Sequence, residues 1–305
     1  MSNQLALFES QVDFSSTKII KLPERIWVFG GQISDIKDPE PISFRDKYLR
    51  HAFSSRASFA PNLAKPEDYP DWWNFAGYPD LLEFESDAGC LAQLIVIFLE
   101  SPGAWVELGA FANDVDLCKK LLVVMSERFR NSTSFIELGP LRRISKHHPD
   151  DDAVCVLPSE SYEKLDQTEL EIITKSIHAR LAKAHKSESW DANKRAHRLL
   201  LAADLADLYQ SIRTSTLIEI AQKFAYNPTP SELNRQAKLL DMLGLANLKE
   251  LGTEKILCTP GRHAHPLLNY QGLPGKRFDR ARFKTDSAIL AQEDAMLKKA
   301  LEGSK

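Results

Sequence analysis

The sequence has few of the features that define disulfide-rich, zinc-binding or membrane proteins. Four cysteines are scattered along the 305 residues without a C-x-x-C pair: Cys90, Cys118, Cys155 and Cys258. This spacing favours buried thiols in a reducing cytoplasm over a disulfide framework or a zinc site. No apolar run approaches the roughly 20 residues that cross a bilayer, and the early acidic residues do not resemble a secretory signal. We therefore expect a cytoplasmic protein without a membrane partner.

Several catalytic motifs are also missing. The chain has no Walker motif, no G-x-S-x-G nucleophile elbow and no G-x-G-x-x-G dinucleotide fingerprint. These absences weaken kinase, serine-hydrolase and ordinary dinucleotide-binding interpretations. Composition is otherwise ordinary for a globular protein, with a formal net charge of -3. A chain of this length can bury a sizeable core, and we expect two domains.

The stretch from residue 93 to 124 organises the chain. Leu94 to Leu99 is an unbroken apolar run of strand length, typical of a parallel strand that is buried on both faces. The sequence Ser101-Pro102-Gly103 breaks it, a helix runs to about Cys118, and a second buried strand spans Leu121 to Val124. This βαβ unit predicts an α/β fold with a flavodoxin- or Rossmann-like parallel sheet.

Glu107 lies in the first turns of the predicted helix, next to the Pro-Gly break. Ligands of open parallel sheets bind beyond the carboxyl ends of the strands, where loops meet helix N-termini. Simple helix electrostatics would also favour a carboxylate there. Gly30 and Gly31 follow another predicted strand, residues 25–29, and their backbone N–H groups face a phosphate or sugar, or else form a tight turn without a ligand.

The segment SPGAWVELGAFAND resembles the signature of nucleoside 2-deoxyribosyltransferase-like proteins, in which a turn with Gly precedes a helix carrying Glu-x-Gly. More closely, it resembles the deoxyribosyltransferase-like effector proteins of bacterial retrons, which act in antiphage defence. Three other stretches match that group: VFGG at 28–31, LLEFES around Glu85, and SFIELGPLRR at 134–143. The resemblance covers the first half of the chain by motif and the second half by organisation only.

The resemblance implies a toxic glycohydrolase that cleaves the N-glycosidic bond of NAD or a related nucleotide. A carboxylate under the anomeric carbon suits the oxocarbenium-like transition state of this reaction, and this role falls to Glu107. Glu85 matches the position of a second acid, which would orient ribose hydroxyls or manage a proton. The substrate path would be lined by Gly30, Gly31, Ser101, Gly103 and Asn113. We expect no metal and no cofactor apart from the nucleotide substrate.

An irregular segment from Ser54 to Tyr78 interrupts the predicted α/β domain, between helices at 42–53 and 79–91. It includes a group of aromatic residues: Tyr69, Trp72, Trp73 and Phe75. Such rings stack on a base or, more commonly, cover the core. The histidines at 147–148 beside the aspartates at 150–152 lack a ligand-like spacing, so an exposed polar loop is the favoured interpretation.

The second half of the chain is predicted to be helical. We place a catalytic domain at 1–158, a basic helical linker at 159–198, a winged-helix-like domain at 199–270 and a basic C-terminal tail at 271–305. Within the winged-helix-like part, helices at 199–208, 216–224 and 229–243 precede a hairpin that turns around Gly252-Thr253. The basic residues that suit nucleic-acid or partner contacts are Lys194, Arg195, Arg198, Arg235 and Lys238.

The resemblance also implies partners, namely a companion reverse transcriptase and its RNA–DNA hybrid, which would hold the toxin in check. A homo-oligomer or a filament with these partners fits the same interpretation. Two alternatives remain open from the residues alone. The chain could be a base-exchange deoxyribosyltransferase, in which a second base replaces water. It could also be a winged-helix DNA-binding regulator whose α/β domain senses a nucleotide without catalysis.

Overall fold

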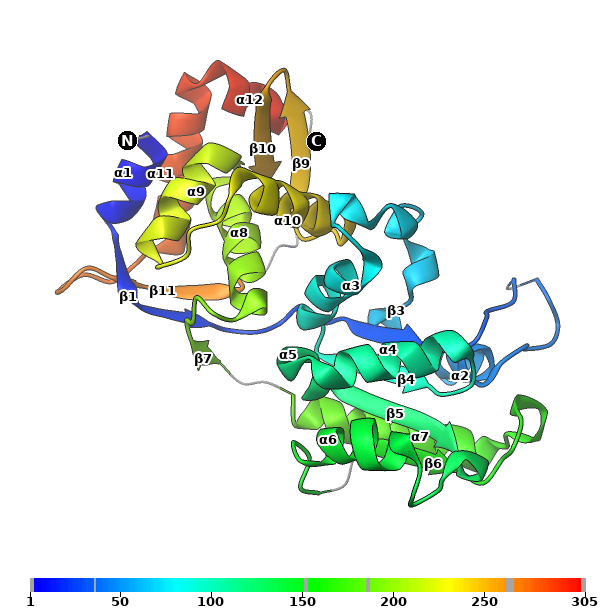
Figure 1. Ribbon diagram of the computed structural model, residues 1–305. Coiled ribbons are helices and arrows are strands. Elements are labelled where there is room, and N and C mark those ends of the chain that lie inside the picture. The colour runs from blue at the N-terminus through cyan, green and yellow to red at the C-terminus, as the bar shows by residue number, and fades with distance from the viewer. Residues whose placement is uncertain (1–2, 36, 151–152, 185–186, 262–265, 303–305) are drawn as a thin grey trace. The chain divides into compact units, whose positions relative to one another are not determined.

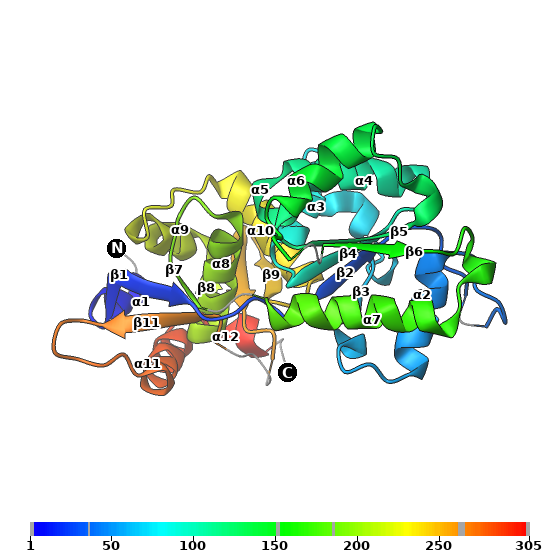
Figure 2. The same ribbon diagram turned by 90° about the horizontal axis from the view of Figure 1, so that it is seen from below.

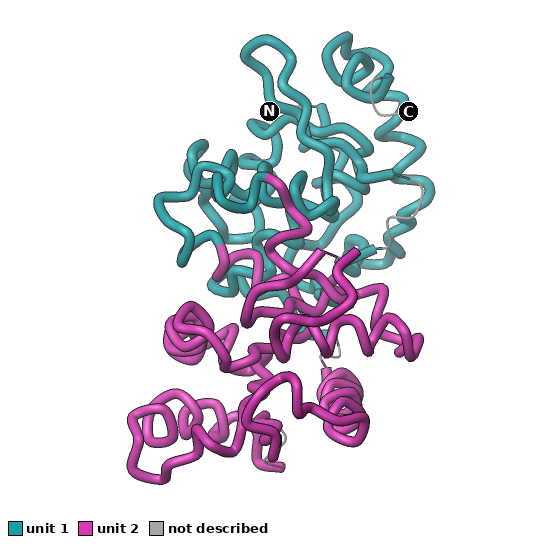
Figure 3. The backbone as a smooth tube through the Cα atoms, turned by 90° about the vertical axis from the view of Figure 1, so that its right-hand side faces the viewer, with its two compact units in different colours: residues 1–22, 71–84, 186–305 teal, residues 23–70, 85–185 magenta. Residues whose placement is uncertain are grey.

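The computed structural model describes residues 3–35, 37–150, 153–184, 187–261 and 266–302. The chain forms two compact units, which Figure 3 colours separately: unit 1 comprises residues 1–22, 71–84 and 186–305, and unit 2 comprises residues 23–70 and 85–185. Among the described residues, none of the helices combines the length and the apolar character needed to cross a bilayer.

Unit 2 is built on a five-stranded parallel sheet (Figure 1). Its strands are β2 (Ile26–Phe29), β3 (Leu63–Ala64), β4 (Leu94–Phe98), β5 (Leu121–Ser126) and β6 (Val154–Leu157). They lie in the order β3-β2-β4-β5-β6. Because the chain winds outward in both directions from β2, this is the doubly wound order, and the direction of winding reverses between β2 and β4.

Helices cover both faces of this sheet (Figure 2). On one face, α2 (Phe44–Ser54) and α7 (Gln167–Ala182) bury Tyr48, Ile173 and Ile177 against the strands. On the other face lie α4 (Pro102–Asn113), α5 (Val115–Cys118) and α6 (Arg142–Ser145). The rings of Phe111 from α4 and Phe29 from β2 pack 5.2 Å apart. The three central strands, β2, β4 and β5, are therefore buried on both sides, as their apolar runs predict.

The predicted elements of unit 2 are confirmed, with two differences. β3 lies inside the segment expected to be irregular, because a two-residue edge strand leaves no periodicity in the sequence. The helix expected to reach Cys118 is divided, because the Asp114 carboxylate accepts hydrogen bonds from the backbone of Asp116 and Leu117 and starts a new turn. The prediction that the four cysteines are buried thiols is also confirmed, since all four are free and buried.

Unit 1 contains a helical segment with a small antiparallel sheet (Figure 1). Its elements follow the order α8 (Arg195–Tyr209), β8 (Ser211–Arg213), α9 (Thr214–Lys223), α10 (Pro230–Met242), β9 (Asn247–Leu251) and β10 (Glu254–Cys258). The strands lie in the order β8-β10-β9. The predicted hairpin is confirmed, because β9 pairs with β10 around Gly252, whose φ of +63° suits glycine. Thr229 caps α10 by accepting from the Glu232 N–H.

Further elements complete unit 1: α1 (Asn3–Glu9), β1 (Val12–Ile19), β7 (Glu188–Ser189), β11 (Leu268–Gly272), α11 (Arg280–Glu293) and α12 (Ala295–Glu302). β1 lies between β11 and β7 in a second antiparallel sheet. Helix α3 (Leu81–Cys90) crosses the boundary between the units. Single-turn helices occupy 60–62, 66–68, 72–77, 127–129 and 162–164, and a π-helical turn spans 137–141.

The units divide the chain differently from the predicted domain boundaries. Residues 1–22 belong to unit 1, because Phe8 packs in an aromatic cluster with Tyr209, Tyr270 and Phe283. The expected linker instead supplies α7 to unit 2 and β7 to unit 1. The expected basic tail folds into α11 and α12, because Phe283 and Leu297 are buried beneath its charged surface.

Candidate active site

The candidate site lies at the carboxyl ends of β2 and β4, where the winding of the sheet reverses. β2 ends at Phe29 and continues into Gly30 and Gly31. β4 ends at Phe98 and leads through Glu100 to Ser101, which caps α4 by accepting a hydrogen bond from the Ala104 N–H. Ser101 Oγ also donates to the Gly30 carbonyl at 3.4 Å. The two loops predicted to form the site are therefore adjacent.

Glu100 holds the two loops together. Its Oε1 accepts from the N–H groups of Gly31 and Arg45, each at 3.0 Å, and its Oε2 accepts from the Phe44 N–H at 2.6 Å. Phe44 and Arg45 form the first turn of α2, so the carboxylate satisfies donors that a helix N-terminus leaves unpaired. This is the position where a bound phosphate would sit in many parallel sheets. Here the chain supplies its own anion.

The glycines are required by close packing. Gly30 has a φ of +152°, and a Cβ on it would lie 2.9 Å from Phe98 Cβ and 3.1 Å from Arg45 Cδ. A Cβ on Gly31 would lie 2.8 Å from Glu100 Cδ. These contacts are too short for any side chain, so the glycines allow Arg45 and Glu100 to approach the strand ends. The Gly31 N–H points to a carboxylate of the protein and not into an open site.

The carboxyl group of Glu107 has a strongly shifted pKa. Burial raises its pKa from 4.5 to about 7, with the positive charge of Arg45 opposing the shift and the negative charge of Glu67 adding to it. Burial disfavours the ionised form because the protein solvates a charge less well than water does. A carboxyl group whose pKa is raised toward neutral pH by burial, among charged neighbours, is typical of catalytic sites.

Arg45 links this carboxyl to a second acid. It is 3% exposed, and its guanidinium donates to the Gly31 carbonyl at 3.2 Å and to Glu67 Oε2 at 2.5 Å. Among the described residues, Arg45 Nε and Glu107 Oε2 are both buried without a hydrogen-bond partner. Unpaired buried polar atoms are rare in folded proteins. A ligand hydroxyl has the donor that Glu107 Oε2 lacks and the acceptor that Arg45 Nε lacks.

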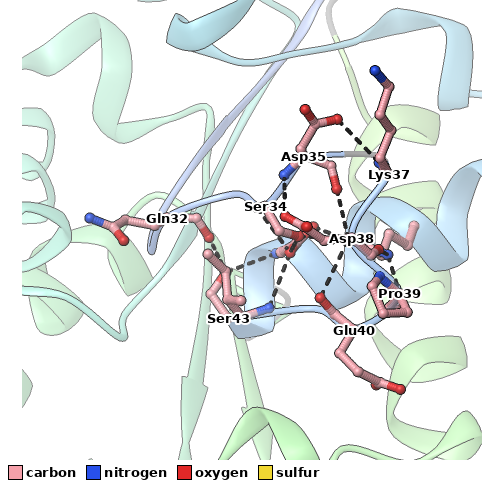
Figure 4. Close-up of polar contacts among 11 residues, drawn as sticks. Gln32, Ser34, Asp35, Lys37, Asp38, Pro39, Glu40 and Ser43 are labelled. Atoms are coloured by element: carbon pink, nitrogen blue, oxygen red, sulfur yellow. Dashed lines mark hydrogen bonds and ion pairs between the residues drawn. The ribbon is translucent and has the colours of Figure 1, made fainter.

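Hydrogen bonds to residues of α2 hold the described part of the loop that follows Gly31 (Figure 4). Asp46 Oδ2 accepts from the N–H groups of Ser34 and Ile42 and from the Ser34 hydroxyl. Burial opposes ionisation of Asp46, but these hydrogen bonds and Arg50 outweigh it and lower its pKa. Arg50 donates to the Asp38 carbonyl at 2.8 Å and to Ser34 Oγ at 2.6 Å. The carboxyl edge of β2 therefore has a preformed loop.

The other predicted site residues lie in different surroundings. Gly103 is exposed in the first turn of α4, and a Cβ on it would meet none of the described atoms within 4 Å. Asn113 is the last residue of α4 and accepts a hydrogen bond from Arg143 at 2.9 Å. It lies six residues beyond Glu107, about 9 Å along the helix axis. Glu85 is 5% exposed in α3. The roles assigned to these residues remain predictions.

Two members of the aromatic segment pack within the protein. The Tyr69 ring lies 5.5 Å from the Trp27 ring of β2, and Trp72 is fully buried 4.7 Å from the Phe84 ring. These two rings therefore pack within the protein, which is the commoner of the two predicted roles. Trp73 is 62% exposed and stays available to a ligand.

Most of the basic residues predicted to contact nucleic acid are already paired within unit 1. Lys194 forms an ion pair with Glu188, and Arg198 lies over the Tyr226 ring and 3.9 Å from Glu232. Arg235 reaches Glu83 at 3.6 Å and lies over the Tyr78 ring. Lys238 is exposed on the same helix. The segment 71–84 thus covers part of the α10 face that was expected to be open.

No cluster of metal ligands forms among the described residues. His148 is buried, and its ring nitrogens lie 2.6 and 3.3 Å from the guanidinium of Arg180. Asp150 pairs with Lys183. The aspartates at 151 and 152 lie outside the described residues, so the predicted loop is described only in part.

Three residues of the site were not identified as such from the sequence: Arg45, Glu67 and Glu100. Glu100 ends the apolar run of β4, and a charged residue between a buried strand and a Pro-Gly break is a usable signal for a site. Arg45 was visible only as one of several basic residues on a helix. Glu67 carried no signal, because its segment has no periodicity that would place it against α2.

Comparisons with known proteins show what the chain is similar to. A family model described as "STM3845 retron effector protein" matches residues 41–248, about two thirds of the chain. The chain is 32% identical over 153 residues to the Escherichia coli "Retron Ec73 putative ribosyltransferase/DNA-binding protein". It is 38% identical over 82 residues to the Escherichia coli "Retron Ec86 putative ribosyltransferase/DNA-binding protein". These matches cover 48% and 27% of the chain, and 46% and 27% of the relatives, so less than half of each relative is matched.

Proposed function

Because the chain belongs to the STM3845 retron effector family, we propose that it is a defence toxin that cleaves the N-glycosidic bond of NAD or a related nucleotide. The observation that carries this proposal is Glu107, a carboxyl with a pKa raised to about 7 and an unpartnered buried oxygen at the switch point of the sheet. The ribosyltransferase part of the relatives' names supports chemistry at the anomeric carbon of a ribose.

In the proposed reaction, Glu107 acts as its carboxylate beneath the anomeric carbon. The bond between that carbon and the base nitrogen breaks, and the leaving base takes the bonding electrons. Glu107 then forms a glycosyl ester or stabilises the oxocarbenium ion. Water attacks the same carbon, the bond to the carboxylate breaks where an ester has formed, and the proton of the water is released to solvent. Arg45 keeps a useful fraction of Glu107 ionised near neutral pH, because its positive charge lowers the carboxyl pKa. Glu85 orients the ribose hydroxyls or transfers a proton.

Unit 1 has the complementary role of holding partners. We propose that α8, α9, α10 and the β9–β10 hairpin form a winged helix, and that unit 2 is deoxyribosyltransferase-like. The order of these elements supports the first assignment, because a sheet strand, two helices and a terminal hairpin follow one another as in winged helices. The partners would be the retron reverse transcriptase and its RNA–DNA hybrid, which restrain the toxin until infection.

A base-release assay tests the proposed chemistry. Purified protein is incubated with NAD and a panel of nucleotides, and released base is separated from intact substrate. Glu107→Gln should lose at least about 100-fold in rate, because the transition state loses an ion pair worth several kcal/mol. Glu171→Gln is the matched control, since Glu171 is exposed on α7 and makes the same change of charge. Full activity in a folded Glu107→Gln protein would refute the assignment.

Base exchange is the second candidate, and the word ribosyltransferase in the relatives' names favours it. Adding a free acceptor base to the assay distinguishes the two reactions. A transferase yields a new nucleoside in proportion to the acceptor, whereas a hydrolase yields free sugar at an unchanged rate. A regulator without catalysis would release no base from any nucleotide, and Glu107→Gln would then alter nucleotide binding only.

A further inference from the structure

Unit 1 contains a basic cleft that no feature of the proposed reaction uses. It has a volume of about 820 Å³ and lies between the end of α1 and the loop that leads from β11 into α11. Figure 2 shows that loop beside β1 and β11. Four of the residues that line the cleft are basic: Lys276, Arg277, Arg280 and Arg282. Ser10, Gln11 and Phe278 contribute polar and aromatic surface.

The loop that carries these cations is anchored to the core. Gly272 has no room for a side chain, because a Cβ there would lie 2.4 Å from the Lys276 carbonyl oxygen and 2.7 Å from the Phe278 nitrogen. The Phe278 ring packs against Tyr270 and Phe283 at 5.6 and 5.7 Å. The loop therefore folds back tightly on β11, and its cations are presented from a fixed backbone.

Arg280 fixes the start of α11 from the inside. Its guanidinium donates to Asp204 and Asp207 at 2.8 to 3.0 Å, and both carboxylates are buried. Burial opposes the charge of Arg280, but Asp204 outweighs it, so the pKa of Arg280 is raised. Asp279 caps α11 by accepting from the Arg282 N–H. Arg280 therefore stabilises the fold through its buried ion pairs, and Asp279 stabilises the start of α11.

The remaining three cations have no ion-pair partner among the described residues. Lys276, Arg277 and Arg282 are exposed, and their side chains make no ion pair or hydrogen bond with any described residue. This distinguishes them from Lys194, Arg198 and Arg235, which are paired with carboxylates of unit 1. Cations that are already paired lose an interaction when they bind a phosphate, whereas unpaired ones only gain one.

We propose that this cleft, and not the exposed face of α10, binds the phosphodiester backbone of a nucleic acid. Three unpaired cations on a fixed loop provide phosphate contacts, and Arg is suited to bidentate contact with phosphate oxygens. The aromatic edge of Phe278 offers a surface for a base at the rim. The inference is independent of the chemistry at Glu107. It depends on the proposed function in one respect only, because the proposed retron partners would supply the nucleic acid that binds in the cell.

The test measures binding of a fluorescent single-stranded DNA of about 20 nucleotides to the full chain by anisotropy, over a salt series. Single-strand binding weakens with a slope of about 0.7 per neutralised phosphate. Changing Lys276, Arg277 and Arg282 to Gln should therefore reduce the slope by about 2. In the wild type, these three contacts should account for a roughly 20-fold loss of affinity between about 50 and 200 mM salt.

Two further triple variants serve as comparisons. Changing Lys175, Lys298 and Lys299 to Gln removes the same charge from exposed sites on α7 and α12 and should leave the slope unchanged. Changing Lys194, Arg198 and Arg235 to Gln tests the ion-paired set and should have a smaller effect than the cleft variant. An unchanged slope in the cleft variant, or an equal loss in the α7–α12 variant, would overturn the proposal.

Competition and activity identify what the cleft recognises. Inorganic phosphate at the same phosphate concentration should displace the DNA poorly, because a polymer makes several contacts at once. Equal displacement by inorganic phosphate would indicate a site for small anions and would overturn the nucleic-acid assignment. Binding of the protein to anionic vesicles without any binding to DNA would overturn it as well. Base release should be unchanged in the cleft variant. A wild type that binds DNA but releases no base would refute the proposed reaction and leave this inference standing.

Discussion

In unit 2 the charged groups at the sheet edge interact with one another, and Arg45 is fully buried among them. In the unit 1 cleft, by contrast, three of the four cations are exposed and have no ion-pair partner among the described residues. Arg45 lowers the pKa of Glu107 and Glu67 raises it, and Glu100 accepts hydrogen bonds from three backbone N–H groups. Lys276 and Arg277 have no such partners among the described residues. Buried coupled charges set a pKa and therefore a pH dependence. Exposed charges act through the ionic atmosphere and therefore produce a salt dependence.

The largest expected effect is that of Glu107→Gln on the pH dependence of the free energy of unfolding. The pKa of Glu107 is raised from 4.5 to about 7 in the folded protein, so its contribution is fully present below pH 4.5 and is lost as the pH rises through 7. The loss amounts to about 3 kcal/mol. Denaturant unfolding at several pH values should show Glu107→Gln gaining that amount relative to wild type between low pH and pH 8.

Glu171→Gln is the control for that measurement, and it should keep a constant difference from wild type at every pH. A parallel pH dependence of Glu107→Gln and wild type would show that the Glu107 carboxyl titrates like a solvated one. The candidate site would then lose its distinguishing feature.

Much of the α/β unit could be predicted from the sequence, because its strands are buried on both faces. A run such as Leu94 to Leu99 has only one reasonable structure when it is bounded by a Pro-Gly break. The loops after β2 and β4 followed from the same reasoning, since parallel strands bring their carboxyl ends to one edge. Glu107 could be placed at that edge by the same reasoning, and the family resemblance then distinguished it from a carboxylate that only stabilises the helix N-terminus.

The environment of Glu107 could not be predicted, because it depends on contacts between distant segments. Arg45 and Glu67 are 22 residues apart and meet only because α2 and the turn at 66–68 pack together. The same limit applies to unit 1, where Phe8 and Tyr209 pack across about 200 residues. Periodicity reports which face of an element is buried, but not which segment covers it.

Glu100 provides a smaller effect, which tests whether its charge is structural. Glu100→Gln keeps one oxygen acceptor but presents an amide NH₂ group to backbone donors of Gly31, Phe44 or Arg45. An unpaired buried donor costs about 1–3 kcal/mol, and thermal or denaturant unfolding should show that loss. Lys276→Gln in the cleft should change stability by less than about 0.5 kcal/mol. Equal effects of the two substitutions would contradict the contrast between buried and exposed charge.

Arg45 and Glu67 should move the pH–rate profile in opposite directions. Arg45 lowers the pKa of Glu107 and Glu67 raises it, and the proposed reaction needs the carboxylate. Arg45→Met should therefore shift the rising limb of kcat/KM for base release to higher pH, and Glu67→Gln should shift it to lower pH. Arg45→Lys keeps the charge and should restore much of the profile. Shifts in the same direction would show that the three groups do not interact as described.

The smallest expected effect is that of salt on the same profile. Mobile ions screen exposed charges over about 8–10 Å at physiological ionic strength, but they do not enter the space between buried groups. Arg45 is 3% exposed, so its effect on the Glu107 pKa should survive an increase from about 50 to 200 mM salt, with the limb moving by only a few tenths of a pH unit. DNA binding at the cleft should weaken many-fold over the same range.

The pH–rate profile and the DNA binding are measured on one preparation, so that each serves as the control for the other. A limb that moved with salt as strongly as the binding does would mean that water and ions reach Glu107 freely, and the raised pKa on which the proposed reaction depends would not hold.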